Sequence, residues 1–281
     1  MKKPKAWRIL FRLEFAEALR SRWVLFTAIV YALLFAGFVW LGLTESSVLG
    51  FTGLSRVVLN MANAVVLAIP LVALVATSQV VVRARQSGFF ELLLTQPVRR
   101  RDWFIASVAS RFLMVVGPLV VLFVGATLAS VFRGEDTSGL MAIVARCLAV
   151  TVSLAWAFLG LGFWSSSVAR TPERATVFAL FLWLVSSALH DFALIGALLR
   201  FKWPPAVVFG LAAVNPVETA RIAVLGSVDP ELSVLGPVGF WLANTLGPRM
   251  TLALGIAWPA SIGVVCLLLA QRRLYRADLV G

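Results

Sequence analysis

The sequence contains few of the side chains that carry enzyme chemistry. It has one histidine, two cysteines and four lysines in 281 residues. A single histidine cannot supply paired imidazole ligands for zinc, and the two cysteines, which stand in separate apolar runs, form no CxxC motif. No lysine follows a GxxxxGK[ST] loop, so the chain has no P-loop with which to bind ATP. We therefore predict no enzyme activity and no catalytic, cofactor-binding or metal-binding residue in this chain.

Charged residues are also scarce. They make up 14% of the chain, whereas hydrophobic residues make up 60% and the mean hydropathy is +0.94. A soluble domain has about 25% charged and about 45–50% apolar residues. This composition excludes an ordinary soluble enzyme, a disordered chain and a small secreted scaffold held by disulfides.

The sequence contains several long stretches without a charged residue. Residues 23–43 contain no charged side chain, and a helix of that length is about 31 Å long, close to the thickness of a bilayer's hydrocarbon core. Six membrane-spanning helices are predicted in all, at 23–43, 57–82, 112–132, 147–169, about 175–195 and 250–270. The predicted fold class is an all-α membrane protein, with residues 1–281 forming a single transmembrane domain.

The positive charges lie in the connecting segments. A net charge of +12 would suit nucleic-acid binding in a soluble protein, but in a membrane protein it more often sets the topology and attracts anionic lipid. Membrane lipid is therefore a predicted partner and nucleic acid is not. With a cytoplasmic N-terminus, 17 Lys and Arg residues lie inside and 6 lie outside. The positive-inside rule thus predicts that both termini are cytoplasmic.

An amphipathic cytoplasmic helix is predicted within residues 1–22, leading into the first span. Its apolar face is formed by Trp7, Leu10, Phe11, Phe15 and Ala18. Glu14 also falls on this face, although a plain interfacial helix keeps its carboxylates away from its apolar side. Two interpretations remain open: Glu14 pairs with a nearby arginine at the headgroup level, or it contacts a protein partner.

The first cytoplasmic loop, residues 83–111, has the most specific pattern. Ser87 is expected to cap a short helix over Phe89–Thr95, which Pro97 would end. Apolar side chains on such a helix would form an exposed docking surface, unless the helix lies half-sunk in the membrane interface. Phe89 and Phe90 would point to different faces, so at most one would be the central anchor. The residues assigned to this surface are Ser87, Gly88, Phe89, Phe90, Glu91, Leu92, Leu93 and Leu94.

The segment 200–249, before the last span, carries repeated signals for helix starts. Asn215 is expected to cap a helix with Pro216 at its first position and Glu218 at its third, ending near Gly226. Further short helices are expected at residues 229–236 and 237–246. These interfacial or extracytoplasmic helices would either cap the bundle or receive an extracytoplasmic partner. The candidate docking residues are Asn215, Pro216, Glu218 and Arg221.

His190 and Asp191 stand near the outer end of the fifth predicted span. Ionisable residues at membrane depth are functional candidates by default. The two residues are therefore candidates for a substrate or proton site, although their place near the interface also allows a purely structural role.

The loop at 83–111 resembles that of the ABC-2 type transporter permeases, which reads roughly E-R-G-T-L-E-L-L-L-S-x-P-V-S-R-R-D. Residues 14–23 (EFAEALRSRW) are similar to the family's amphipathic N-terminal helix. Within the family, residues 49–54, 190–196 and 215–221 most resemble the NosY-type membrane subunit of the transporter for nitrous-oxide-reductase maturation. The chain departs from the family pattern at Phe89, where threonine is usual. The matching loop residues are Gly88, Glu91, Leu92, Leu93, Leu94, Pro97, Val98, Arg100, Arg101 and Asp102.

The resemblance implies a permease subunit of the bacterial inner membrane that forms a homodimer and binds two separate cytoplasmic ATPase subunits. ATP and Mg²⁺ would be bound by those ATPases. Glu14 and residues 87–94 would couple them to the membrane helices. The NosY-type resemblance further implies a periplasmic partner and a role in maturing the copper site of nitrous-oxide reductase. The alternatives are a general exporter of lipid, glycan or drug, and a non-transporting scaffold of an envelope or motility complex.

Overall fold

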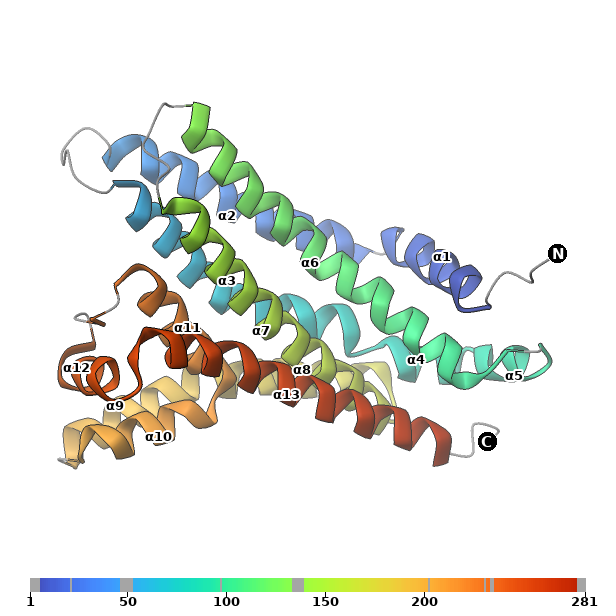
Figure 1. The fold of residues 1–281 in the computed structure, drawn as a ribbon. Helices are drawn as coiled ribbons and strands as arrows, with labels where there is room; N and C mark the ends of the chain where they lie inside the picture. The colour runs from blue at the N-terminus through green and yellow to red at the C-terminus, as the bar shows by residue number, and fades with distance from the viewer. Residues whose placement is uncertain are drawn as a thin grey trace.

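The computed structural model describes residues 6–20, 22–45, 53–96, 98–132, 139–201, 203–229, 231–232 and 235–276. Every regular element within these ranges is helical, in agreement with the predicted fold class (Figure 1). In chain order the helices are α1 (Ala6–Leu19), α2 (Arg22–Glu45), α3 (Gly53–Thr77), α4 (Val80–Gln86), α5 (Phe89–Leu94), α6 (Arg100–Phe132), α7 (Leu140–Val168), α8 (Pro172–Leu184), the π-helical turn η1 (Val185–Leu189), α9 (His190–Arg200), α10 (Pro205–Val214), α11 (Pro216–Val228), α12 (Gly236–Thr245) and α13 (Gly247–Arg276).

Several apolar helices are long enough to cross a membrane, as expected for a multi-pass membrane protein. Five stretches of the described residues could cross a bilayer, and α10 with α11, bent by 118° at the break between them, would add a sixth. The first predicted span coincides with α2. Within α2, Leu25–Leu34 is an apolar helical stretch that is shorter than the five spanning stretches. The exact number of spans stays a prediction. The five stretches are Ala64–Gln86, Arg100–Gly125, Met141–Val168, Pro172–Leu198 and Gly247–Arg276.

Helix α7 lies at the centre of the bundle, where it packs against α13, α3, α11 and α6. Glycines allow the closest of these approaches. A Cβ atom added to Gly160 would lie 2.6 Å from the backbone oxygen of Gly263, so the backbones of α7 and α13 touch there. Close contact between small residues is a common way to join helices in lipid, where apolar burial supplies little driving force.

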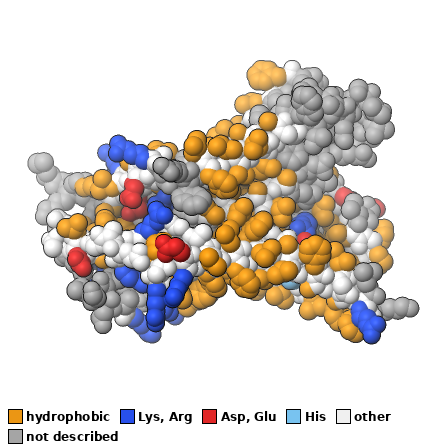
Figure 2. Space-filling view, turned by 180° about the vertical axis from the view of Figure 1, so that it is seen from behind, with side chains coloured by type: hydrophobic (Ala, Val, Ile, Leu, Met, Phe, Trp, Pro, Cys, Tyr) orange, Lys and Arg blue, Asp and Glu red, His pale blue; other side chains and the backbone are white. Residues whose placement is uncertain are grey.

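The two ends of the bundle differ in composition. Helix α1 and the C-terminal turns of α13 lie at one end together with α4 and α5, whereas α10, α11 and α12 lie at the other (Figure 1). Figure 2 shows Lys and Arg side chains gathered toward the α1–α5 end and hydrophobic side chains covering the middle of the bundle. An apolar belt of this kind is what exposure to lipid requires.

In the segment 200–249, which was predicted to form surface helices, helix α11 is instead buried. Helix α11 packs against α13, α7 and α3, and eight of its 13 residues are buried. It is therefore part of the bundle interior and not an interfacial cap. Helix α11 ends at Val228, two residues beyond the end predicted near Gly226. Helix α12 matches the helix predicted at 237–246. Within the helix predicted at 229–236, residues 230 and 233–234 lie outside the described residues, and 231–232 are not helical.

Candidate functional site

The short helix predicted in the first loop is present as α5, but Ser87 does not cap it. Gly88 stands at the N-cap with a φ of 71°, a left-handed conformation that glycine adopts without steric cost. Ser87 instead ends α4, where its hydroxyl donates to the backbone oxygen of Ala84 at 3.3 Å. The predicted cap was wrong because Gly88 holds the N-cap position of α5, and Ser87 is the C-cap of the preceding helix α4. Pro97 lies outside the described residues.

One face of α5 is anchored to the chain's own core. Phe90 is 1% exposed, and its ring packs edge-on against Trp103 with ring centroids 4.8 Å apart. Leu93 is buried as well, and Phe89 is half-buried with its ring 5.9 Å from the same indole. Because Phe90 and Leu93 are covered, the surface that α5 exposes is narrower than the predicted docking surface.

The exposed face of α5 carries Glu91 and Leu92. Leu92 is 69% exposed, so it gives this face of α5 an apolar surface. Leu94 is the last residue of the helix. Of the two phenylalanines, only Phe89 is partly exposed, so the exposed apolar surface of α5 centres on Leu92 and not on an aromatic ring.

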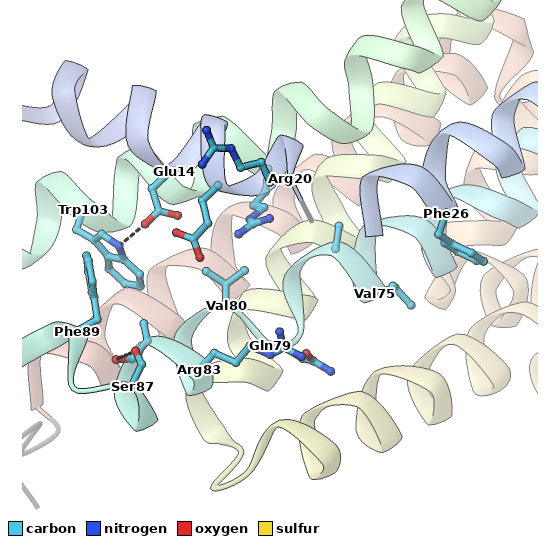
Figure 3. Close-up of a pocket in the computed structure, with 14 residues that line it drawn as sticks. Glu14, Arg20, Phe26, Val75, Gln79, Val80, Arg83, Ser87, Phe89 and Trp103 are labelled. Carbon is cyan, nitrogen blue, oxygen red and sulfur yellow. Dashed lines mark hydrogen bonds between the residues drawn. The ribbon is translucent and has the colours of Figure 1, made fainter. Parts of the chain in front are cut away.

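Glu14 is held inside the molecule on the buried face of α1. It is 8% exposed, and Trp103 Nε1 donates a hydrogen bond to its Oε1 at 2.7 Å (Figure 3). Among the described residues no arginine nitrogen lies within 4.0 Å of this carboxylate. Burial raises the pKa of Glu14 above its ordinary 4.5, although the Trp103 hydrogen bond and the charge of Arg111 oppose that shift. Glu14 therefore joins α1 to α6 and is not exposed to a partner.

Trp103 is the residue that sequence reasoning missed. It is 1% exposed, lies in the first turn of α6, and contacts α1 and α5 at once. A buried indole N–H needs an acceptor, and Glu14 was the one carboxylate predicted on an apolar face, so the pairing had a signal in the sequence. We refer to Glu14, Phe89, Phe90, Leu93 and Trp103 as the coupling cluster.

The remaining candidates meet at the opposite end of the bundle. Arg221 of α11 donates to Asp191 Oδ2 of α9 at 2.9 Å, and it also pairs with Glu218 on its own helix. His190 Nδ1 lies 4.0 Å from Asp191 Oδ1, and its Nε2 lies 3.2 Å from the backbone oxygen of Leu211. The residues predicted as two separate groups therefore form one polar cluster, composed of His190, Asp191, Glu218 and Arg221.

Asn215 fixes the break between α10 and α11 beside this cluster. Its Oδ1 accepts from the Val217 N–H at 3.0 Å, which confirms the predicted cap, and Pro216 occupies the first position of α11. Its Nδ2 donates to the backbone oxygen of Ser186 at 2.6 Å. Ser186 lies in η1, the π-helical turn between α8 and α9, and such turns occur frequently at functional sites. Asn215 thus ties the bent pair to the irregular turn.

The polar cluster links helices by charge and has no evident catalytic geometry. Within the described residues no group of three His, Cys, Asp or Glu is arranged to hold a metal ion. Asn215 is buried and the Glu218 side chain is only 12% exposed, so these two predicted docking residues do not form an outer surface. Exposed side chains of the segment 200–249 include Trp203 and Phe240.

Comparisons with known proteins give one family and two similar sequences. A model of a family described as "ABC-2 family transporter protein" matches residues 8–269. The chain is 26% identical over 271 residues to "Probable ABC transporter permease protein NosY" of Stutzerimonas stutzeri, covering 94% of this chain and 96% of that protein. It is 29% identical over 266 residues to the protein of the same name from Pseudomonas aeruginosa, covering 89% and 96%. The similarity spans nearly the full length of each protein.

Proposed function

The chain belongs to the ABC-2 transporter family, as a multi-pass permease of the inner membrane similar to NosY, and from this membership we propose how it works. It forms a homodimer that binds two separate ATPase subunits on the cytoplasmic side. ATP hydrolysis by those subunits moves α5, and α5 moves the membrane helices. Both termini and the α1–α5 end face the cytoplasm, in accordance with the concentration of Lys and Arg there.

The coupling cluster carries this proposal. Phe90 fixes α5 to Trp103 at the start of α6, and the Trp103–Glu14 hydrogen bond fixes α6 to α1. Leu93 is buried in the same hydrophobic cluster. A close-packed aromatic contact transmits displacement because it has little free volume in which to absorb it. A push on α5 is therefore passed to the helix that leads into α2 and to the first turns of α6 together.

The contact with the ATPase is made by the outward face of α5. Leu92 supplies exposed apolar area and Glu91 supplies a charge at the rim. A short helix with an apolar face suits a groove on a partner, and a rim ion pair contributes under about 1 kcal/mol. Leu92 is thus the main determinant of affinity and Glu91 a minor one.

A binding experiment tests the proposal. Leu92→Ala should weaken binding of the purified ATPase by about 5- to 30-fold, while Glu91→Ala should change it less than about 5-fold. Val121→Ala is the matched control, because Val121 is similarly exposed (71%) but lies on the membrane-spanning part of α6. Affinity is measured by surface plasmon resonance on detergent-solubilised protein. Unchanged affinity in Leu92→Ala would remove α5 from the coupling interface.

We further propose that the transporter serves maturation of the copper site of nitrous-oxide reductase together with a periplasmic protein. The support is the NosY name of the two relatives and the length of the match. Cells that lack this chain should synthesise the reductase but not reduce nitrous oxide, and Leu92→Asp should fail to restore that activity. Normal nitrous-oxide reduction, with altered drug resistance or surface glycan, would instead favour a general exporter.

A further inference from the structure

A cavity of about 900 Å³ opens at the α1–α5 end, between α1, the start of α2, the junction of α3 with α4, α5 and α6. This volume lies within the about 300–1,000 Å³ typical of sites for small molecules. In Figure 3, Arg20 and Glu14 lie above Gln79 and Arg83. Trp103 and Phe89 lie at one side of the cavity, and Phe26 and Val75 lie at the other. The cavity therefore has a charged part and an apolar part.

Three guanidinium groups from three different segments line the charged part: Arg20, Arg83 and Arg111. Among the described residues no carboxylate oxygen lies within 4.0 Å of a nitrogen of these arginines. Arg111 Nε is buried and has no hydrogen-bond partner there. Glu14 and Glu17 offset part of the repulsion among these three cations at Arg111, and an anionic ligand between the arginines would offset the remainder. Guanidinium forks match phosphate oxygens bidentately, so the group that fits is a phosphate.

The same cavity also contains an acidic side chain with no direct partner. Glu14 is already committed to Trp103, but the carboxylate of Glu17 lines the cavity without a hydrogen bond or ion pair within the described residues. The charge of Glu17 acts on Arg111, so a ligand with only negative charge would compete for that arginine and be repelled by this carboxylate. A headgroup that carries an ammonium a few bonds from its phosphate satisfies both signs of charge.

The apolar part of the cavity indicates where the remainder of the ligand goes. Phe26 and Val75 belong to α2 and α3, the two helices that run from the cavity into the apolar middle of the bundle. Phe26 is 37% exposed. Acyl chains attached to the phosphate would leave past these side chains and enter the surrounding bilayer, as expected for a site at headgroup depth.

We propose that this cavity binds an ethanolamine phospholipid, with its phosphate among Arg20, Arg83 and Arg111, its ammonium at Glu17, and its acyl chains between α2 and α3. The site adjoins the coupling cluster through Trp103 and Phe89. The lipid lies between α1, α4 and α6, whose side chains line the cavity. This binding goes beyond the coupling function and does not depend on the ATPase.

Native mass spectrometry of the detergent-purified chain tests the site. Dioleoylphosphatidylethanolamine should remain bound to the wild type, and Arg20→Gln or Arg83→Gln should lower its affinity by about 10-fold or more through loss of a charge-assisted hydrogen bond. Glu17→Gln should weaken this lipid but not dioleoylphosphatidylglycerol. Arg99→Gln and Arg101→Gln are matched controls, because both arginines are exposed and neither lines the cavity.

Several outcomes would overturn the proposal. Equal retention of the lipid in the Arg20→Gln/Arg83→Gln double variant would do so, as would equal binding of dioleoylphosphatidylglycerol and its ethanolamine counterpart by the wild type. Displacement of the lipid by free phosphoethanolamine at similar concentration would assign the site to a soluble phosphate. Exclusion of the lipid by the purified ATPase would assign the cavity to a segment of that protein. Because Arg20 and Arg83 are exposed, their variants should fold, and size-exclusion chromatography verifies this.

Discussion

The coupling cluster and the polar cluster bury their carboxylates in different ways. Glu14 is 8% exposed and is satisfied by the neutral indole of Trp103. Asp191 and Glu218 share the charge of Arg221, in a cluster whose side chains are 12% to 29% exposed. The first arrangement depends on close packing, whereas the second depends on ion pairs among partly covered side chains.

This difference bears on movement. Close-packed rings have one good arrangement, so the coupling cluster is suited to carry a displacement without changing its contacts. A shared arginine can exchange one carboxylate for another or for water at little cost, because part-exposed ion pairs are weak. We therefore expect the ion pair between α9 and α11 to break when the helices rearrange, while the contacts of the coupling cluster stay intact.

The largest effect is expected at the coupling cluster. Trp103→Ala removes a fully buried aromatic ring and leaves Glu14 without its donor, which should lower the free energy of unfolding by about 3–5 kcal/mol. Trp103→Phe retains most of the ring volume and should cost only about 1–3 kcal/mol. Chemical denaturation in detergent, followed by intrinsic fluorescence, measures both. Equal losses in the two variants would show that the hydrogen bond, and not packing, dominates the cluster.

A smaller effect is expected at the polar cluster. Arg221→Met leaves Asp191 and Glu218 side by side without a counter-charge, and should lower the free energy of unfolding by about 1–3 kcal/mol. Adding Asp191→Asn should recover part of that loss, since one of the two carboxylates is then neutral. The same denaturation assay measures the coupling energy between the two positions. Additive losses would mean that Arg221 does not serve as the shared counter-charge.

The smallest effect concerns the pH dependence of the coupling cluster. Because burial raises the pKa of Glu14 above 4.5, the folded state holds this proton more tightly than the unfolded state does. The associated stability is complete below the unfolded pKa and is lost as the pH rises through the folded pKa. Relative to Glu14→Gln, the wild type should therefore lose stability above pH 4.5, with a slope under about 1.4 kcal/mol per pH unit. A parallel pH profile in the two proteins would contradict the shift.

The sequence was most informative where the cause is local. The apolar runs predicted long helices, and the Asn215-Pro216 pair predicted the start of α11, because a cap and a fixed proline φ act within one turn. Ser87 shows the limit of such reasoning. A serine before a helix is a good cap, but the left-handed Gly88 that follows it takes the N-cap position and leaves Ser87 to the preceding helix.

Exposure could not be read from residue types. Phe90 and Leu92 are both apolar residues of the short helix α5, yet one is 1% and the other 69% exposed. Their difference depends on Trp103, which approaches α5 from the start of α6. Periodicity predicted that neighbouring side chains of α5 face different ways, but it could not tell which face would meet the core.

The amino-acid sequence by itself determined that this is a helical membrane protein, which family it resembles, and where several of its helices begin. These properties follow from run length, charge and capping, which act over a few neighbouring residues. Only the tertiary structure decided that Glu14 pairs with Trp103, 89 residues away, and that Asp191 meets Arg221, 30 residues away. Such pairings depend on the 118° bend between α10 and α11 and on how helices distant in the chain pack together, which no local pattern encodes.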